Sequence, residues 1–201
     1  MTLQDDDDFR AAIGEERREA RRAAKAFADA AASGDVERFF EAVDAFSYCV
    51  GAWEPAMRRV ARLDMVSDQI RAAFLNIWIE HKMHPLEVGN RPVLARALRV
   101  LLPRQKNAGP LQLYRGANAS ERRRRLYGFS WSTNRDIARG FAEHWQRGTV
   151  GGVVLETLAT PEAILHLREP EDYYDEAEVV VDPFKLGKVK VAEHLPASPH
   201  A

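Results

Sequence analysis

The chain has 201 residues, of which 46% are hydrophobic and 29% are charged, and its formal net charge is −1. These proportions are ordinary for a globular protein and exclude a largely disordered chain or one that binds nucleic acid through its overall charge. A single cysteine, Cys49, excludes an internal disulfide framework and offers no cysteine-rich metal site, so we expect no metal. The acidic start and the lack of a long apolar segment predict no export signal and no membrane span, and hence a cytoplasmic location.

The first hundred residues carry the pattern of helices. In residues 8–32, apolar side chains recur at steps of three, four or seven, which is the spacing of one helical face. Ser-Gly-Asp at 33–35 then offers a helix stop followed by a new N-cap. Similar patterns predict further helices over residues 36–46, 54–63, 67–81 and 92–102. We therefore expect a helical region over residues 1–105.

The pattern changes after residues 103–110, where two prolines and a glycine mark a boundary. One helix is predicted over residues 134–145, with Asn134 as its N-cap. Short apolar runs predict strands at residues 111–116, 128–133, 151–158, 163–167, 178–183 and 188–195. We expect an α+β fold in which residues 106–196 form a strand-rich core and residues 197–201 form a frayed tail.

Two polar motifs lie at the ends of the first two predicted strands. The planar guanidinium of Arg115 can clasp a phosphate, and Gly116 after it would let a ligand approach the backbone. Ser130 and Ser132 share one face of the next strand, while Trp131 between them points toward the core. Serines before a helix are most often caps, which explains Ser132 better than Ser130.

A third motif is the pair Glu176 and Glu178. In an extended chain, side chains two residues apart point to the same face, so the two carboxylates would lie side by side and repel each other. A solvated strand end is the ordinary interpretation of such a pair. A functional site that uses both charges is the alternative.

In this order, Tyr-Arg-Gly at 114–116, Ser-Trp-Ser at 130–132 and Glu-Ala-Glu at 176–178 resemble the three motifs of the arginine–serine–glutamate class of mono-ADP-ribosyltransferases. Tyr173 stands at the position of the aromatic residue that precedes the last motif in this class. The resemblance covers residues 111–192, and Trp131 departs from it because the class has threonine there. It implies an ADP-ribosyltransferase-type split β-sandwich and an enzyme that takes NAD as its substrate.

The resemblance also implies roles for single residues. Enzymes of this class cleave the bond between nicotinamide and ribose in NAD and pass ADP-ribose to a nucleophile. Glu178 would stabilise the positive charge that develops on the ribose, and Glu176 would activate the acceptor as a general base. The residues expected to bind NAD are Arg115, Gly116, Ser130 and Ser132, and Tyr173 is expected to recognise the acceptor.

The acceptor stays open between two classes of molecule. Within the family, Glu-x-Glu goes with arginine acceptors, and the acids of residues 171–182 would attract a guanidinium, so an arginine of a target protein is favoured. Against it, the four arginines at 122–125 can contact nucleic-acid phosphates, serve the pyrophosphate of NAD, or form a solvated loop. A nucleic-acid base is therefore the second candidate. Water, in an NAD glycohydrolase, and a non-catalytic binding module on the same fold are further alternatives.

The helical region carries many large apolar residues, so we expect it to pack on the catalytic domain. It can also bind an antitoxin, a chaperone or the target. An intracellular enzyme of this kind would be a toxin, a defence protein or a phage effector, and the sequence does not choose among these.

Overall fold

The structure is a computed structural model that describes residues 3–46, 49, 51–80, 88–104, 109–146, 151–168 and 177–198, with side chains from Arg10 onward except that of Gln146. The chain divides into two compact units, the helical unit Met1–Pro103 and the sheet unit Arg104–Ala201. Each unit is described by itself, and the expectation that they pack on each other stays a prediction. No helix in the described part of the chain is long and apolar enough to cross a membrane.

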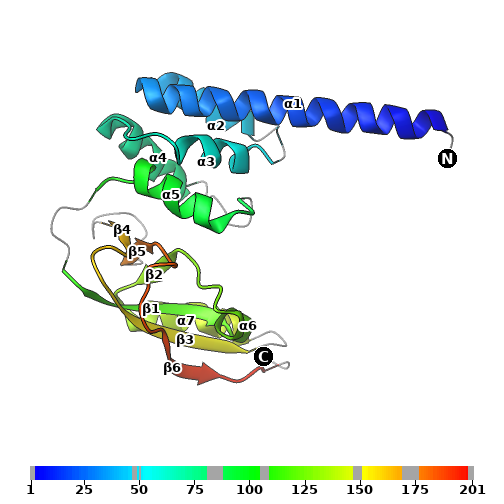
Figure 1. Cartoon of the computed structure of the whole chain (residues 1–201). Coiled ribbons are helices and arrows are strands. Elements are labelled where there is room, and N and C mark those ends of the chain that lie inside the picture. Colours follow the sequence, from blue (N-terminus) through cyan, green and yellow to red (C-terminus); the bar gives the residue numbers. More distant parts are fainter. Residues whose placement is uncertain are drawn as a thin grey trace. The chain divides into compact units, whose positions relative to one another are not determined.

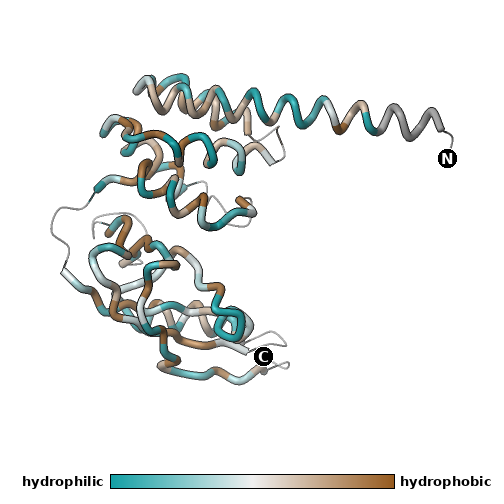
Figure 2. Tube along the Cα trace, viewed as in Figure 1, coloured by the Kyte–Doolittle hydropathy of each residue, from teal (hydrophilic) through white to brown (hydrophobic). Residues whose placement is uncertain are grey.

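Five helices make up the described part of the helical unit, each close to a segment where the apolar periodicity predicts one. They are α1 (Leu3–Ser33), α2 (Val36–Phe46), α3 (Trp53–Val60), α4 (Asp68–Glu80) and α5 (Arg91–Leu101) (Figure 1). Helix α1 packs on α2 and α3, and α5 packs on α3 and α4. Hydrophobic residues are interspersed with hydrophilic ones along these helices, as expected for helices that each bury one face (Figure 2).

The turn between α1 and α2 forms as the sequence predicts. Gly34 adopts a positive φ of 79°, in the left-handed region that glycine tolerates best. The Asp35 carboxylate then accepts a hydrogen bond of 3.1 Å from the backbone N–H of Arg38, which caps the start of α2.

Aromatic side chains fill the core of the helical unit. The ring of Phe27 lies 4.5 Å from that of Phe39 and 5.4 Å from that of Phe46, measured between centroids. Trp53 completes the group with its ring centroid 4.7 Å from that of Phe46. Phe27 and Phe39 are fully buried, so these rings contribute a large part of the apolar area that the unit removes from water.

The sheet unit contains an open six-stranded sheet in the order β4-β5-β2-β1-β3-β6, in which all neighbouring strands are antiparallel. An α+β fold is confirmed, and each predicted strand is present with slightly different ends. The split β-sandwich of the ADP-ribosyltransferases stays a prediction. The strands are β1 (Leu111–Asn118), β2 (Ser130–Ser132), β3 (Gly152–Ala159), β4 (Ile164–Leu167), β5 (Glu178–Val181) and β6 (Lys190–Leu195), and the helices are α6 (Ala119–Arg124) and α7 (Arg135–Gln146) (Figure 1).

Helix α6 corrects the interpretation of the arginine run as a loop. The side chain of Asn118 accepts hydrogen bonds from the backbone N–H groups of Ser120 and Glu121, at 2.9 and 3.0 Å. These bonds satisfy donors that a helix start leaves without partners, so Asn118 acts as an N-cap. The helix ends at Arg125, whose φ of 54° is left-handed. Arginine is also a good helix former, and the run therefore forms one short helical turn and its cap.

Helix α7 lies unusually close to the sheet. A Cβ atom on Gly116 of β1 would stand 2.1 Å from the carbonyl oxygen of Ala138, and one on Gly152 of β3 would stand 2.0 Å from that of Ala142. Two glycines and two alanines therefore form the contact, and Ala138 and Ala142 are buried. The Cβ atom of Phe141 also lies close to this contact, 2.6 Å from the position that a Cβ on Gly116 would take.

The opposite face of the sheet carries a separate core. Trp131 is 3% exposed there and packs with Leu113, Leu155 and Val179. Its indole N–H donates a 3.1 Å hydrogen bond to the carbonyl of Gly128, which satisfies the one polar group of the ring. The expectation that Trp131 faces the core is confirmed.

Candidate active site

Three adjacent strands bring the predicted motifs together. Strand β2 lies between β5 and β1, and Ser132 stands opposite Glu178 on one side and opposite Tyr114 on the other. Residues directly opposed in antiparallel strands project to the same face of a sheet. Parts of the chain that are up to 64 positions apart in the sequence (178 − 114) thus form one row across the sheet.

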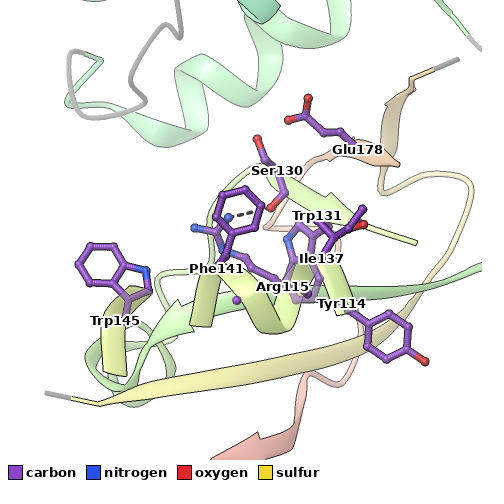
Figure 3. Close-up of a pocket in the computed structure, with 11 residues that line it drawn as sticks. Tyr114, Arg115, Ser130, Trp131, Ile137, Phe141, Trp145 and Glu178 are labelled. Atoms are coloured by element: carbon purple, nitrogen blue, oxygen red, sulfur yellow. Dashed lines mark hydrogen bonds between the residues drawn. The ribbon is translucent and has the colours of Figure 1, made fainter. Parts of the chain in front are cut away.

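A cavity of about 240 Å³ opens beside this row. Every predicted NAD-binding residue lines it, together with Glu178, whereas Glu176 and Tyr173 lie outside the described residues. In Figure 3, Trp145 lies at the end of the cavity away from Glu178, and Phe141 lies between them. The lining residues are Tyr114, Arg115, Gly116, Ser130, Trp131, Ser132, Ile137, Ala138, Phe141, Trp145 and Glu178.

Arg115 is held by partners within the protein. Its Nε and Nη2 donate hydrogen bonds of 3.2 Å each to the two carboxylate oxygens of Glu121, and its Nη1 donates one of 2.7 Å to the carbonyl of Ser130. The guanidinium fits because position 128 is glycine, where a Cβ would stand 2.4 Å from the Arg115 Cζ. In this geometry Arg115 ties β1 to α6 and β2 and fixes the backbone of Ser130 at the cavity.

The two serines have different surroundings. The hydroxyl of Ser132 accepts a 3.0 Å hydrogen bond from the backbone N–H of Asn134, and Ser132 is 6% exposed. Asn134 in turn accepts a 2.8 Å bond from the N–H of Asp136 and caps α7 as predicted. Ser130 is only partly buried, and Figure 3 shows its hydroxyl on the same side of the ribbon as the carboxylate of Glu178. The bond to the N–H of Asn134 thus gives Ser132 a role in the turn before α7, and the hydroxyl of Ser130 is the one suited to a ligand.

Glu178 is the first residue of β5, and its side chain is 13% exposed. Its carboxylate lies 3.9 Å from Nη1 of Arg168, whose side chain is 7% exposed, and the N–H of Arg168 donates a 3.0 Å bond to the Glu178 carbonyl. The guanidinium of Arg168 thus places a positive charge beside this largely buried carboxylate. Arg168 thus contacts Glu178 twice, through a backbone hydrogen bond and through an ion pair between the two side chains.

The backbone at Ala177 corrects the argument from strand alternation. Its φ of 45° is left-handed and not extended, and β5 begins only at Glu178. Alternation between the two faces of a sheet holds only along extended residues. The inference that Glu176 and Glu178 share one face by alternation is therefore wrong as argued, since the residue between them breaks the strand.

Gly116 also receives a different explanation from the one the sequence suggests. It lines the cavity, but the group that approaches its backbone most closely is helix α7, at the distance that only a glycine allows. The packing of the helix is therefore a sufficient reason for glycine at this position.

Sequence reasoning missed two contributors to the site. Arg168 follows β4 directly, but no local signal shows that this strand pairs with that of Glu178. The apolar stripe of α7 formed by Ile137, Phe141 and Trp145 gives only the signal of helical periodicity in the sequence. Phe141 is 51% exposed and Trp145 is 44% exposed, so this stripe forms a wall of the cavity and not a core face.

The described residues include no group of three or more histidine, cysteine, aspartate or glutamate side chains placed to hold a metal ion. The chain matches no family model, no curated protein and no solved structure. The residues of the site are therefore the basis on which a function can be inferred.

Proposed function

We propose that this protein is a mono-ADP-ribosyltransferase that cleaves NAD and transfers ADP-ribose to a macromolecule. The observation that carries the proposal is the convergence of Arg115, Ser130 and Glu178, from three separate motifs, on one cavity. These residues lie on three different strands, and nothing in their local sequence requires them to meet. Convergence of this kind supports a shared site more strongly than each motif does alone.

The residues of the cavity suit the chemistry that cleavage of NAD requires. Cleavage of the bond between nicotinamide and ribose develops positive charge on the ribose, and a fixed carboxylate such as that of Glu178 would stabilise this charge. The ion pair with Arg168 orients the carboxylate of Glu178. The hydroxyl of Ser130 can donate a hydrogen bond to the carboxylate or to a ribose oxygen.

The aromatic end of the cavity suits the flat rings of NAD. Phe141 and Trp145 line the wall with much of each ring exposed, although burial would be favourable for both. An aromatic ring of a ligand can stack on such surfaces. The exposure of these two side chains therefore supports a ligand that carries a planar ring.

An arginine of a target protein is the acceptor that the Glu-x-Glu motif favours, with Glu176 as the general base. A protein of this activity would act inside the cell as a toxin, a defence protein or a phage effector, and the helical unit would bind an antitoxin, a chaperone or the target. These roles extend the proposal beyond NAD cleavage, and each needs its own test.

The proposal is tested by incubating the purified full chain with NAD labelled in the adenosine half. Release of nicotinamide is measured by chromatography, and label on protein or nucleic acid is located by mass spectrometry. Glu178→Gln should keep the fold and lower nicotinamide release by about a hundredfold or more, because it removes the charge facing the ribose.

Glu193→Gln is the matched control, because Glu193 lies on β6 outside the cavity and pairs with Arg139 on the surface. It should retain activity close to that of the unchanged protein. Equal rates of nicotinamide release from the unchanged protein and Glu178→Gln would refute the assignment of the site. Glu176→Gln should lose transfer to arginine and keep NAD hydrolysis, and a parallel loss of both would refute the separate role of Glu176.

A further inference from the structure

Helix α6 and its C-cap carry four successive arginines, Arg122–Arg125, in the immediate neighbourhood of the cavity. The one acid of the helix is Glu121, and both of its carboxylate oxygens are bonded to Arg115. Glu121 is therefore not available to neutralise the arginines that follow it. The run keeps its positive charge, while the rest of the chain brings the net charge to −1.

The arginines of α6 differ from many others on the surface. Arg18, Arg58 and Arg139 each form an ion pair with a glutamate on the same helix. Arg123, Arg124 and Arg125 are exposed, and no carboxylate among the described residues pairs with them. The Nε atom of Arg122 is buried and has no hydrogen-bond partner among the described residues. An unneutralised run of this kind is suited to an external anion.

The geometry of the run indicates an extended anion and not a single one. Successive residues of a helix project in directions about 100° apart, so adjacent arginines spread around the turn instead of closing on one point. Arg125 leaves the helix with a left-handed backbone and turns away again. A chain of phosphates can contact guanidinium groups that point in different directions. One phosphate cannot contact all of them at once.

The position of α6 connects this surface with the cavity. Glu121 holds Arg115, which lines the cavity, and the N–H of Ala119 donates a 3.2 Å bond to the carbonyl of Gly151 just before β3. The helix therefore lies at the end of the sheet where β1 finishes and β3 starts (Figure 1). Ala142 of α7 packs on Gly152 at this same end of the sheet. Phe141 and Trp145 flank Ala142 along the helix.

We propose that Arg122–Arg125 bind the phosphate backbone of a single-stranded nucleic acid whose bases reach the exposed rings of Phe141 and Trp145. Basic side chains that follow the backbone, combined with aromatic rings on which bases stack, are the means by which proteins hold single strands. An acidic peptide would use the charges but not the rings. This inference concerns binding beside the cavity and goes beyond the proposed function, and the acceptor that the Glu-x-Glu motif favours there is still a protein arginine.

The test is fluorescence anisotropy of the full chain with a labelled single-stranded oligonucleotide of mixed sequence, over about 50 to 200 mM salt. The variant Arg123→Ala/Arg124→Ala/Arg125→Ala should bind at least about tenfold more weakly at the lowest salt. Its slope of log affinity against log salt should fall by about 2, which is three phosphates at about 0.7 each.

The control variant Arg18→Ala/Arg22→Ala/Arg58→Ala removes the same charge from exposed arginines of the helical unit that are ion-paired. It should leave the slope unchanged. A second variant, Phe141→Ala/Trp145→Ala, should weaken binding by about tenfold without changing the slope, since stacking is not ionic. Equal losses in the α6 variant and the control variant would overturn the proposal.

Two further outcomes would also overturn it. A poly-glutamate peptide that binds as tightly as the oligonucleotide, with the same loss in the α6 variant, would assign the surface to an acidic protein. A higher KM for NAD in the α6 variant would assign it to the pyrophosphate of NAD. Nicotinamide release by the unchanged protein is measured on the same samples, so a failure of NAD cleavage refutes the proposed function and leaves the binding result to stand by itself.

Discussion

The core of the helical unit and helix α7 of the sheet unit place their large aromatic residues in opposite ways. In the helical unit, Phe27, Phe39 and Phe74 are fully buried and build the core. In the sheet unit, helix α7 uses alanines to contact the sheet and leaves Phe141 and Trp145 about half exposed in the wall of a cavity.

Buried polar residues divide between the units in the same way. Among the described residues, all the polar or charged side chains classed as buried belong to the sheet unit, namely Ser132, Thr157, His166, Arg168 and Asp182. Burying a polar group costs stability unless it has partners, so a chain retains such groups where they serve structure or chemistry. The helical unit therefore buries apolar side chains, whereas the sheet unit also buries polar ones, among them Ser132 in the cavity and Arg168 beside Glu178.

The largest expected difference in stability is between two phenylalanines, one from each unit. Phe39→Ala should lower the free energy of unfolding by about 3–5 kcal/mol, because it empties a fully buried site. Phe141→Ala should change it by less than about 1 kcal/mol, because half of the ring is already in water. Under the proposed function, Phe141→Ala should instead raise the KM for NAD.

Urea denaturation of both variants and NAD kinetics of Phe141→Ala measure this comparison. A Phe141→Ala variant that is as unstable as Phe39→Ala would show that the ring belongs to a core. Phe141 would then not differ from Phe39 in its contribution to stability.

A second comparison lies within the sheet unit, between two glycines near α7. Gly152→Ala should destabilise the protein by about 1–3 kcal/mol, because its Cβ would meet backbone atoms of Ala142 that cannot move aside. Gly140→Ala, on α7 itself, meets nothing within 4 Å and should stabilise the protein by up to about 1 kcal/mol through helix propensity. Thermal denaturation of the two variants gives the sign of each effect, and equal destabilisation by both would contradict the close contact of helix and sheet.

The smallest expected effects separate the two serines. Ser132→Ala should cost about 1 kcal/mol, because the N–H of Asn134 loses its acceptor at the start of α7. Ser130→Ala should change stability by less than about 0.5 kcal/mol and should weaken NAD binding or turnover more than Ser132→Ala does. Denaturation and NAD titration of both variants decide the point. Normal stability of Ser132→Ala combined with lost NAD binding would reverse the assignment.

The sequence predicts the elements of the fold better than their contacts. Short apolar runs identify each strand, and helical periodicity identifies the five helices of the first unit, because these signals are local. The contact of α7 with the sheet depends on Gly116 and Gly152, which are far apart in the sequence and meet only in the folded unit. No periodicity reports a contact of that kind.

In the candidate site, too, the sequence shows local motifs but not the contacts between distant residues. Arg115, Ser130 and Glu178 could be chosen from motifs, because each motif is a short string of residues. The partners of Arg115 and Glu178, which are Glu121 and Arg168, depend on how α6 and β4 pack, so the sequence offers no direct signal for them. The cap at Asn118 is different, since an asparagine before Ser and Glu is a readable helix start, and the correction at α6 was within reach of the sequence.

The left-handed backbone at Ala177 has a consequence for how this site can evolve. In an unbroken strand, the insertion or loss of one residue turns every side chain beyond it to the other face of the sheet. At Ala177 the strand conformation stops, and the alternation of β5 begins anew at Glu178, opposite Ser132. Changes of length in the segment before Ala177 therefore need not move Glu178.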